Sequence, residues 1–201
     1  MKITTVAQLR ERYGHPGERA IKKELAHLDR HMQRFIALSP LVVLASSDAQ
    51  HQLDASPRGG SPGFVKVPNE TTLWLPDAPG NNRLDTLENV LATSRLGLLF
   101  FIPGVDEMLR VQGQASLCTD AHILGAFSSE VRPPKLVIEI AVESAYLHCA
   151  KAMMRSRLWS PDSQVDRALL PSMGEMIKDH AQLDGPVESQ ADMLKRYADD
   201  L

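Results

Sequence analysis

The chain has 201 residues, of which 43% are hydrophobic, and a formal net charge of −3. This length suits one domain with a sizeable core, and the slightly acidic balance gives no reason to expect nucleic-acid or anionic-membrane partners. Two cysteines cannot form a disulfide framework, and the sequence shows neither a signal peptide nor an apolar stretch of membrane-spanning length. We therefore expect a cytoplasmic protein.

The N-terminal part predicts helices followed by a hairpin. Thr4 or Thr5 can cap a short helix that ends at Tyr13. Apolar residues at three- and four-residue spacing predict a longer helix over residues 17–37. Residues 41–47 form an apolar run of strand length, and residues 51–55 are the expected return strand.

The central part predicts further strands with short helices between them. Residues 64–75 have the pattern of a β-hairpin, and residues 84–93 that of a helix. Strands are expected over residues 96–102, 108–117 and 135–147, with a short helix beginning at 119–120. Successive strands without βαβ alternation favour an antiparallel barrel.

The composition of the sequence changes near residue 160, where Pro and Gly begin to interrupt polar helices. We divide the chain into an N-terminal helical segment (1–38), a barrel (39–160) and a C-terminal helical extension (161–201). The extension reads as a peripheral or dimer-clasping arm, so we expect a single domain overall.

Two turns each combine a lone arginine with glycines and small polar side chains. Arg58 lies in the segment 54–63, and Arg83 lies in the segment 79–85 directly before the predicted helix. An arginine beside the unpaired N–H groups of a helix N-terminus favours a phosphate. A bound phosphorylated cofactor is one interpretation, and two polar turns in an all-β domain are the other.

These segments carry a family resemblance. The run Ser56-Pro57-Arg58-Gly59-Gly60-Ser61, the run Asn81-Asn82-Arg83-Leu84-Asp85, and residues 97–104, 109–115 and 148–159 resemble the FMN-binding pyridoxamine 5'-phosphate oxidase-like family. The resemblance covers roughly residues 20–165 and is closest to a bacterial branch of uncharacterised members. It implies a mainly β fold with flanking helices, namely a six-stranded antiparallel Greek-key split barrel. It also implies a homodimer with FMN at the subunit interface.

The resemblance and the two turns together define candidate cofactor-binding residues. Arg58, Gly59 and Ser61 are expected near the ribityl chain and the ring edge, and Asn82 with Arg83 near the FMN phosphate, one positive charge fewer than the family typically places there. The full candidate set is Arg58, Gly59, Ser61, Val65, Trp74, Asn82, Arg83, Leu84, Arg110, Gln112, Lys151, Arg155, Ser156 and Trp159.

Several of these residues have a plainer interpretation. Arg58 can be a solvent-exposed turn residue, and Asn82 a helix cap with Arg83 in solvent. Trp74 can flank the flavin or pack in the core. Arg110 and Gln112, two residues apart on one strand, lie on the same face, which can line the cofactor or face solvent.

The segment after the last strand is rich in cations. Lys151, Arg155 and Trp159 are spaced to share one face of a helix, where two cations suit an anionic ligand and the indole can stack on a flat ring. His148 and Cys149 lack a third and fourth ligand at suitable spacing, so no metal site is expected.

The function expected from these features is an FMN-dependent oxidoreductase acting on an unidentified small molecule by hydride transfer. FMN supplies the redox reactivity, and no pair of catalytic acid and base residues is identified. Two alternatives stay open: a flavin-binding protein without catalysis, and a split-barrel protein that uses deazaflavin or haem, with His148 as the candidate haem ligand.

Overall fold

The computed structural model describes residues 2–78 and 80–198. Contacts within the chain separate a larger unit, residues 1–155, from a smaller one, residues 156–201. The predicted C-terminal extension lies within the smaller unit.

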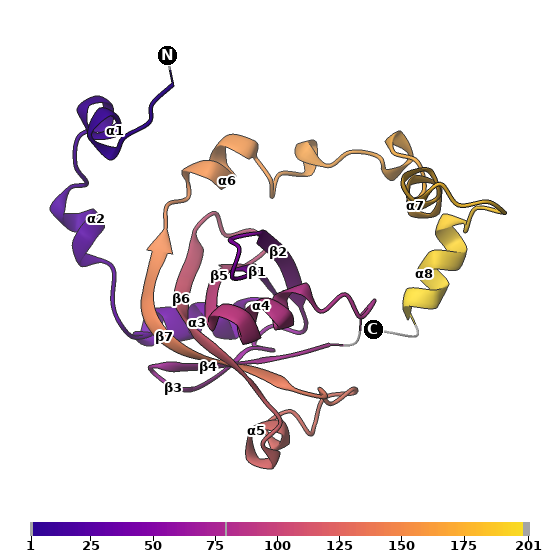
Figure 1. Ribbon diagram of the computed structural model, residues 1–201, viewed down its shortest axis with the longest axis horizontal. Coiled ribbons are helices and arrows are strands. Elements are labelled where there is room, and N and C mark those ends of the chain that lie inside the picture. Colours follow the sequence, from indigo (N-terminus) through magenta and orange to yellow (C-terminus); the bar gives the residue numbers. More distant parts are fainter. Residues whose placement is uncertain (1, 79, 199–201) are drawn as a thin grey trace. The chain divides into compact units, whose positions relative to one another are not determined.

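Seven strands form one antiparallel sheet in the order β2-β1-β5-β6-β7-β4-β3 (Figure 1). They are β1 (Leu41–Ser47), β2 (Leu53–Gly59), β3 (Lys66–Asn69), β4 (Thr72–Pro76), β5 (Arg95–Phe101), β6 (Met108–Cys118) and β7 (Val137–His148). The resemblance implies six strands, whereas the sheet has seven. Both strands of the hairpin expected over residues 64–75 are present, as β3 and β4. The antiparallel sheet with flanking helices is otherwise as predicted.

The helices are short and several are capped by side chains. They are α1 (Val6–Tyr13), α2 (Glu18–Lys22), α3 (Arg30–Leu38), α4 (Asp85–Thr93), α5 (Ala121–Gly125), α6 (Lys151–Ser156), α7 (Met173–Ala181) and α8 (Gln190–Ala198). Thr5 caps α1 as predicted, since its side chain accepts a hydrogen bond from the Gln8 amide.

The continuous helix expected over residues 17–37 is wrong, because the chain is not helical between α2 and α3. Leu25 instead forms a β-bridge with Ala145, with backbone N···O distances of 3.0 and 2.8 Å. Asp29 then starts α3 by accepting hydrogen bonds from the amides of His31 and Met32. The apolar spacing is real, but this stretch of backbone pairs with β7.

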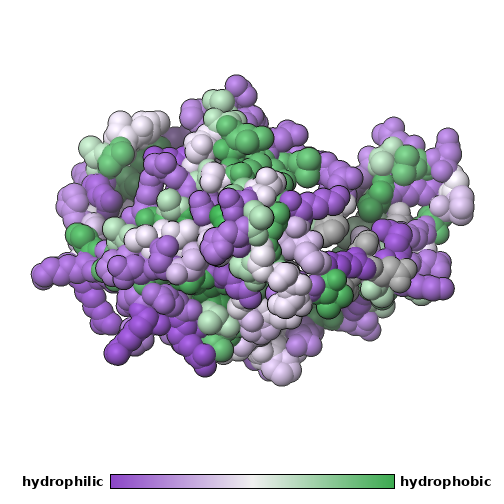
Figure 2. Space-filling model, turned by 90° about the horizontal axis from the view of Figure 1, so that it is seen from below, coloured by the Kyte–Doolittle hydropathy of each residue, from purple (hydrophilic) through white to green (hydrophobic). Residues whose placement is uncertain are grey.

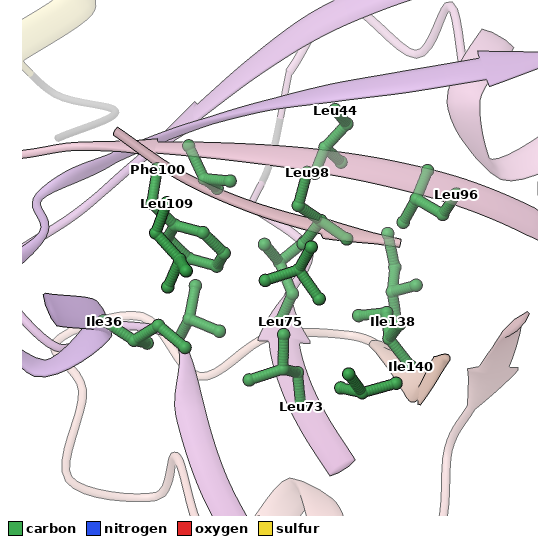
Figure 3. Close-up of a cluster of buried hydrophobic side chains, with 14 of the residues drawn as sticks. Ile36, Leu44, Leu73, Leu75, Leu96, Leu98, Phe100, Leu109, Ile138 and Ile140 are labelled. Atoms are coloured by element: carbon green, nitrogen blue, oxygen red, sulfur yellow. The ribbon is translucent and has the colours of Figure 1, made fainter. Parts of the chain in front are cut away.

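Side chains from both halves of the sheet meet in one core (Figure 3). Leu44 and Phe100 come from β1 and β5, Leu75 from β4 and Ile138 from β7, and all four are fully buried. Ile36 of α3 joins the same cluster. Burial of each such side chain stabilises the fold by about 1.5–3 kcal/mol. The sheet therefore curls around its own inner face, as a barrel does.

The outer face of the sheet is the opposite one, and part of it is apolar and exposed. Leu41 and Leu53 are 37% and 88% exposed. In the space-filling view of Figure 2, apolar side chains likewise reach the surface among hydrophilic ones on the side seen from below in Figure 1. Alternation along each strand places one set of residues in the core and the other set on this outer face.

The smaller unit contains two 3-10 helices, Pro161–Ser163 and Arg167–Leu169, followed by α7 and α8. Gly174 of α7 lies close to the segment before α8, since a Cβ at this position would lie 2.3 Å from the Glu188 carbonyl oxygen. Arg196 pairs with the Glu188 carboxylate at 2.9 Å, which lowers the pKa of that carboxyl.

Candidate functional site

A pocket of about 480 Å³ opens beside the outer face of the sheet. Its volume falls in the range of small-molecule sites. Residues of five strands line it: Ala45, Ser46, Ser47, Leu53, Asp54, Ala55, Arg95, Leu96, Gly97, Gln112, Gly113 and Glu143.

The floor of this pocket is a row of small residues. Ala55 of β2 is paired with Ala45 of β1, Ala45 with Gly97 of β5, and Gly97 with Gln112 of β6. Directly paired residues of an antiparallel sheet lie on the same face. Their small side chains leave a flat surface on which a planar ligand can lie, with the Gln112 amide at one end. This row is called the floor row below.

A β-bulge sets one wall of the pocket. Gln112 pairs with Ser144 but Gly113 pairs with Val142, so Glu143 is the extra residue on β7. Its carboxylate forms an ion pair with Arg95 and accepts a 3.0 Å hydrogen bond from the Gln114 amide. Bulges commonly re-aim a side chain in this way. The wall is polar, but its charges largely neutralise each other.

Helix α4 is fastened to the β1–β2 hairpin by polar side chains. The Thr86 hydroxyl donates to the Asp54 carboxylate at 2.6 Å, and the Asn89 amide donates to the Ser46 hydroxyl at 2.9 Å. Thr86, Asn89 and Ser46 are all buried. Buried polar groups need such partners, so these bonds fix the start of α4 next to the strands that line the pocket.

The loop before α4 has an unusual backbone. Asn82 and Leu84 have positive φ angles of 60° and 42°. Leu84 occupies the N-cap position and makes no side-chain capping bond, so the alternative interpretation of Asn82 as the helix cap is wrong. A left-handed leucine is strained, and without a side-chain cap the first N–H groups of α4 stay available for an anion.

Arg83 lies in this loop among carboxylates. Its guanidinium Nε bonds the Asp85 carboxylate at 2.9 Å, and this bond raises the pKa of Arg83, with a further contribution from the charge of Asp54. Its side chain is 76% exposed and can therefore turn toward a ligand. The predicted phosphate loop thus carries one cation and two nearby anions.

The other predicted turn, residues 54–63, is not a loop throughout, because Arg58 lies in a strand. Arg58 belongs to β2, opposite Val42 of β1, which corrects its predicted place after the strand. Its guanidinium bonds the Ser56 hydroxyl and the Pro57 carbonyl. Gly59 ends β2, and Ser61 is exposed in the turn that follows.

Val65 and Trp74 belong to packed clusters. Val65 is 3% exposed and lies in the main core. The Trp74 indole N–H donates to Glu139 at 2.8 Å, and its ring packs against the small cluster formed with Phe127. Of the two interpretations of Trp74, the structure therefore supports packing.

Asp77, just after β4, has a perturbed pKa and yields a testable prediction. Burial raises the pKa of Asp77, and the charges of Arg58 and Lys135 offset part of this rise. The folded chain then holds this proton more tightly than the unfolded chain, so stability falls as the pH rises through the raised pKa. We expect Asp77→Asn to raise the urea midpoint at neutral pH, with the gain shrinking in acid. A gain that grows as the pH falls would contradict this assignment.

Arg110 and Gln112 lie on the outer face of β6, as their spacing predicts. Their cross-strand partners on β5 are Leu99 and Gly97. Gln112 lines the pocket, whereas Arg110 lies one row further along the sheet.

The cationic segment after β7 forms a shorter helix than expected. Helix α6 ends at Ser156, and Arg157 has a positive φ of 52°. Trp159 therefore lies beyond the helix, so the predicted shared face holds for Lys151 and Arg155 but is wrong for Trp159. The Arg155 guanidinium turns back onto the Lys151 carbonyl at 3.0 Å. Ser156 and Trp159 belong to the smaller unit.

The structure therefore gathers few of the predicted residues around the pocket. Of the candidate set, Gln112 is the member that lines it. Sequence reasoning missed Ala45, Ala55, Gly97 and the wall pair Arg95 and Glu143. Small residues at outward-facing strand positions were the available signal, but their alignment depends on strand register.

Residues 2–78 and 80–198 contain neither a metal-binding cluster nor a membrane-spanning helix. No cluster of three or more His, Cys, Asp or Glu side chains there is arranged to hold a metal ion. Among the helices of this part of the chain, none combines the length and the apolar character needed to cross a membrane.

Comparison with known proteins gives a family match. The model of the pyridoxamine 5'-phosphate oxidase family matches residues 28–149. None of the curated proteins matches the chain.

Several solved structures are similar to this chain at low sequence identity. A variant of HupZ from Group A Streptococcus is 18% identical, with a TM-score of 0.51, and the match covers 60% of this chain and 99% of that one. A protein from Lactobacillus delbrueckii, described as a candidate pyridoxamine 5'-phosphate oxidase, is 19% identical, with a TM-score of 0.49 and coverages of 62% and 98%. The heme storage protein HutZ from Vibrio cholerae is 11% identical, with a TM-score of 0.42 and coverages of 60% and 93%. The HupZ match, at 18% identity, shows the split-barrel fold alone.

Proposed function

Because the chain belongs to the pyridoxamine 5'-phosphate oxidase family, we propose that it is an FMN-binding flavoprotein that oxidises or reduces a small molecule. The observation that carries this proposal is the floor row, a flat strip of small residues inside a pocket of about 480 Å³. A planar ring system needs such a strip, and pockets of this size hold cofactors of this class.

The chain offers groups for each part of the cofactor. Ala45, Ala55 and Gly97 would support the ring, and the Gln112 amide would hydrogen-bond its polar edge. Arg83, the Asn82 amide and the uncapped start of α4 would hold the phosphate. FMN supplies hydride-transfer chemistry when bound, while the residues of the chain bind and orient it.

The phosphate end of this site is weakened by its own carboxylates. Asp85 pairs with Arg83, and the charge of Asp54 also acts on Arg83. A dianionic phosphate must compete with both for the guanidinium. FMN affinity should therefore rise when Asp85 is neutralised, which gives the proposal a test in each direction.

A homodimer is part of the proposal. Leu41 and Leu53 are exposed apolar residues on the outer face, close to the floor row. A second copy of the chain would cover this face and enclose the ring between the subunits. A stable dimer of this kind buries about 2,000 Å² or more. Analytical ultracentrifugation tests this part, and a monomer that still binds FMN tightly would contradict it.

The experiment for the proposed function is a titration of the purified chain with FMN and, separately, with riboflavin, followed by absorbance and fluorescence. We expect Arg83→Ala to weaken FMN binding at least about tenfold, because it removes a charge-assisted phosphate contact. Riboflavin, which has no phosphate, should bind both proteins equally. Asp85→Asn should tighten FMN binding and leave riboflavin unchanged.

The control for this titration is an arginine outside the proposed site. Arg34→Gln, an exposed arginine of α3, should leave both affinities unchanged. If Arg83→Ala leaves the FMN affinity unchanged, the phosphate does not bind at this loop. A Soret band in the purified protein would favour haem. FMN that is bound but neither reduced by NAD(P)H nor reoxidised would favour a flavin-binding protein without catalysis.

A further inference from the structure

A second group of polar side chains lies one row along the sheet from the floor row. Leu99 of β5 is paired with Arg110 of β6, and Arg110 with Tyr146 of β7. His148 follows Tyr146 by two residues, so both point to the outer face. The centroids of these two rings lie 6.2 Å apart.

The N-terminal segment brings another cation to the same ring. The bridge between Leu25 and Ala145 holds this segment alongside β7. Lys23 then donates from Nζ to the Leu147 carbonyl at 2.7 Å. Its Nζ lies 5.0 Å from the centroid of the Tyr146 ring, and the Arg110 guanidinium carbon lies 5.8 Å from the same centroid.

Lys23 and Arg110 differ from Arg95 and Arg83 in how they are paired. Arg95 pairs with Glu143, and Arg83 pairs with Asp85. Within residues 2–78 and 80–198, neither Lys23 nor Arg110 forms an ion pair with a carboxylate. The adjacent Glu24 carboxylate accepts a hydrogen bond from the Ser144 hydroxyl instead. The Lys23 ammonium and the Arg110 guanidinium therefore keep donors that no carboxylate of these residues engages directly.

The cluster is connected to the pocket through one side chain. With its amide oriented to satisfy its hydrogen bonds, Gln112 accepts from Arg110 Nη2 at 3.1 Å and from Nε at 3.2 Å. Gln112 also lines the pocket. A molecule that lies on the floor row near Gln112 can thus place a substituent against Arg110.

We propose that Arg110, Tyr146, His148 and Lys23 form a subsite for the anionic group of the substrate, a carboxylate or phosphate attached to a small planar body. This inference rests on the proposed function, since it places the substrate beside the cofactor. The Arg110 guanidinium has further N–H donors that suit an oxyanion, and Lys23 places a positive charge beside the Tyr146 ring. Gln112 holds the fork in place.

The test is an NMR titration of the full chain, without flavin, using benzoate and inorganic phosphate as separate probes. We expect saturable shifts of the Arg110 Nε–H signal and of the amides around Tyr146 and His148. Arg110→Gln should weaken the preferred probe at least about tenfold, and Arg110→Lys less, because lysine keeps the charge but loses the fork. Lys23→Gln should weaken it severalfold.

Lys22→Gln is the matched control. Lys22 precedes Lys23 but pairs with Glu18 on the surface of α2, so its loss should leave the titration unchanged. Far-ultraviolet circular dichroism and the urea midpoint establish that each variant is folded. Shifts that are equal in Lys22→Gln and Lys23→Gln would overturn the contribution of Lys23.

The outcomes separate this inference from the proposed function. If the chain shows saturable anion shifts but does not bind FMN, the subsite is supported and the proposed flavin binding is contradicted. FMN binding without any localised anion shift would overturn the subsite. A third result, in which Arg110→Gln weakens FMN but not riboflavin while Arg83→Ala changes neither, would overturn the substrate assignment and place the cofactor phosphate here.

Discussion

Replacing Gly113 by alanine is expected to destabilise the fold by at least about 3 kcal/mol, a large part of the stability of a typical domain. A Cβ at this position would lie 2.0 Å from the Ala141 carbonyl oxygen and 3.1 Å from Cγ2 of Ile140. Gly113 sits at the β6–β7 bulge, where neither strand can move aside without losing its pairing. Urea unfolding followed by circular dichroism measures the loss.

Gly97→Ala is the matched control for this prediction. Gly97 also lies within a strand, but a Cβ there would lie 3.7 Å from the Ala45 Cβ, an ordinary contact. We expect this substitution to change the free energy of unfolding by less than about 1 kcal/mol. Equal effects of the two substitutions would show that Gly113 is not held by close approach, and that the register at the bulge is not the one described.

Much of the fold follows from local sequence pattern. The strand predicted over residues 41–47 coincides with β1, and the helix predicted over 84–93 differs from α4 by one residue. Both have strong apolar periodicity that their tertiary surroundings use without change. The prediction of one helix over residues 17–37 is wrong because Leu25 forms a β-bridge with Ala145, far away in the sequence. No local sequence pattern indicates that pairing.

The end of β2 was harder to predict for a different reason. Ser-Pro-Arg-Gly has the composition of a turn, yet Ser56, Pro57 and Arg58 are all in the strand. β2 is an edge strand of the sheet, where a proline is tolerated because its missing N–H costs no ladder bond on the open side. Edge position is a property of the whole topology and cannot be read from four residues.

The candidate site was predicted less well than the fold. Gln112 was found because it belongs to a recognisable strand motif, whereas Ala45, Ala55 and Gly97 carry no chemical signal of their own. They form a floor only because the pairings of β2, β1 and β5 align them. Glu143 reaches the wall through a bulge, which shifts the register by one residue. A site formed by strand register, and not by a sequence motif, can be predicted only when the pairing of the strands is known.

Filling the floor row should abolish flavin binding. Ala45 is its central member, paired on one side with Ala55 and on the other with Gly97, and its side chain is exposed. We expect Ala45→Phe to lower FMN and riboflavin affinity alike, by about a hundredfold or more, because the phenyl ring occupies the surface on which the flavin ring would lie. Titration with both flavins measures this loss.

Ala92→Phe, at an exposed position on α4, is the control and should bind both flavins normally. Since both alanines are exposed, both variants should fold with nearly unchanged urea midpoints. The oligomeric state is measured in parallel, because the added ring would also meet a second copy on this face. A loss of FMN binding that leaves riboflavin untouched would place the obstruction at the phosphate end. Normal binding of both flavins by Ala45→Phe would exclude the floor row as the flavin site and leave the pocket to a different ligand.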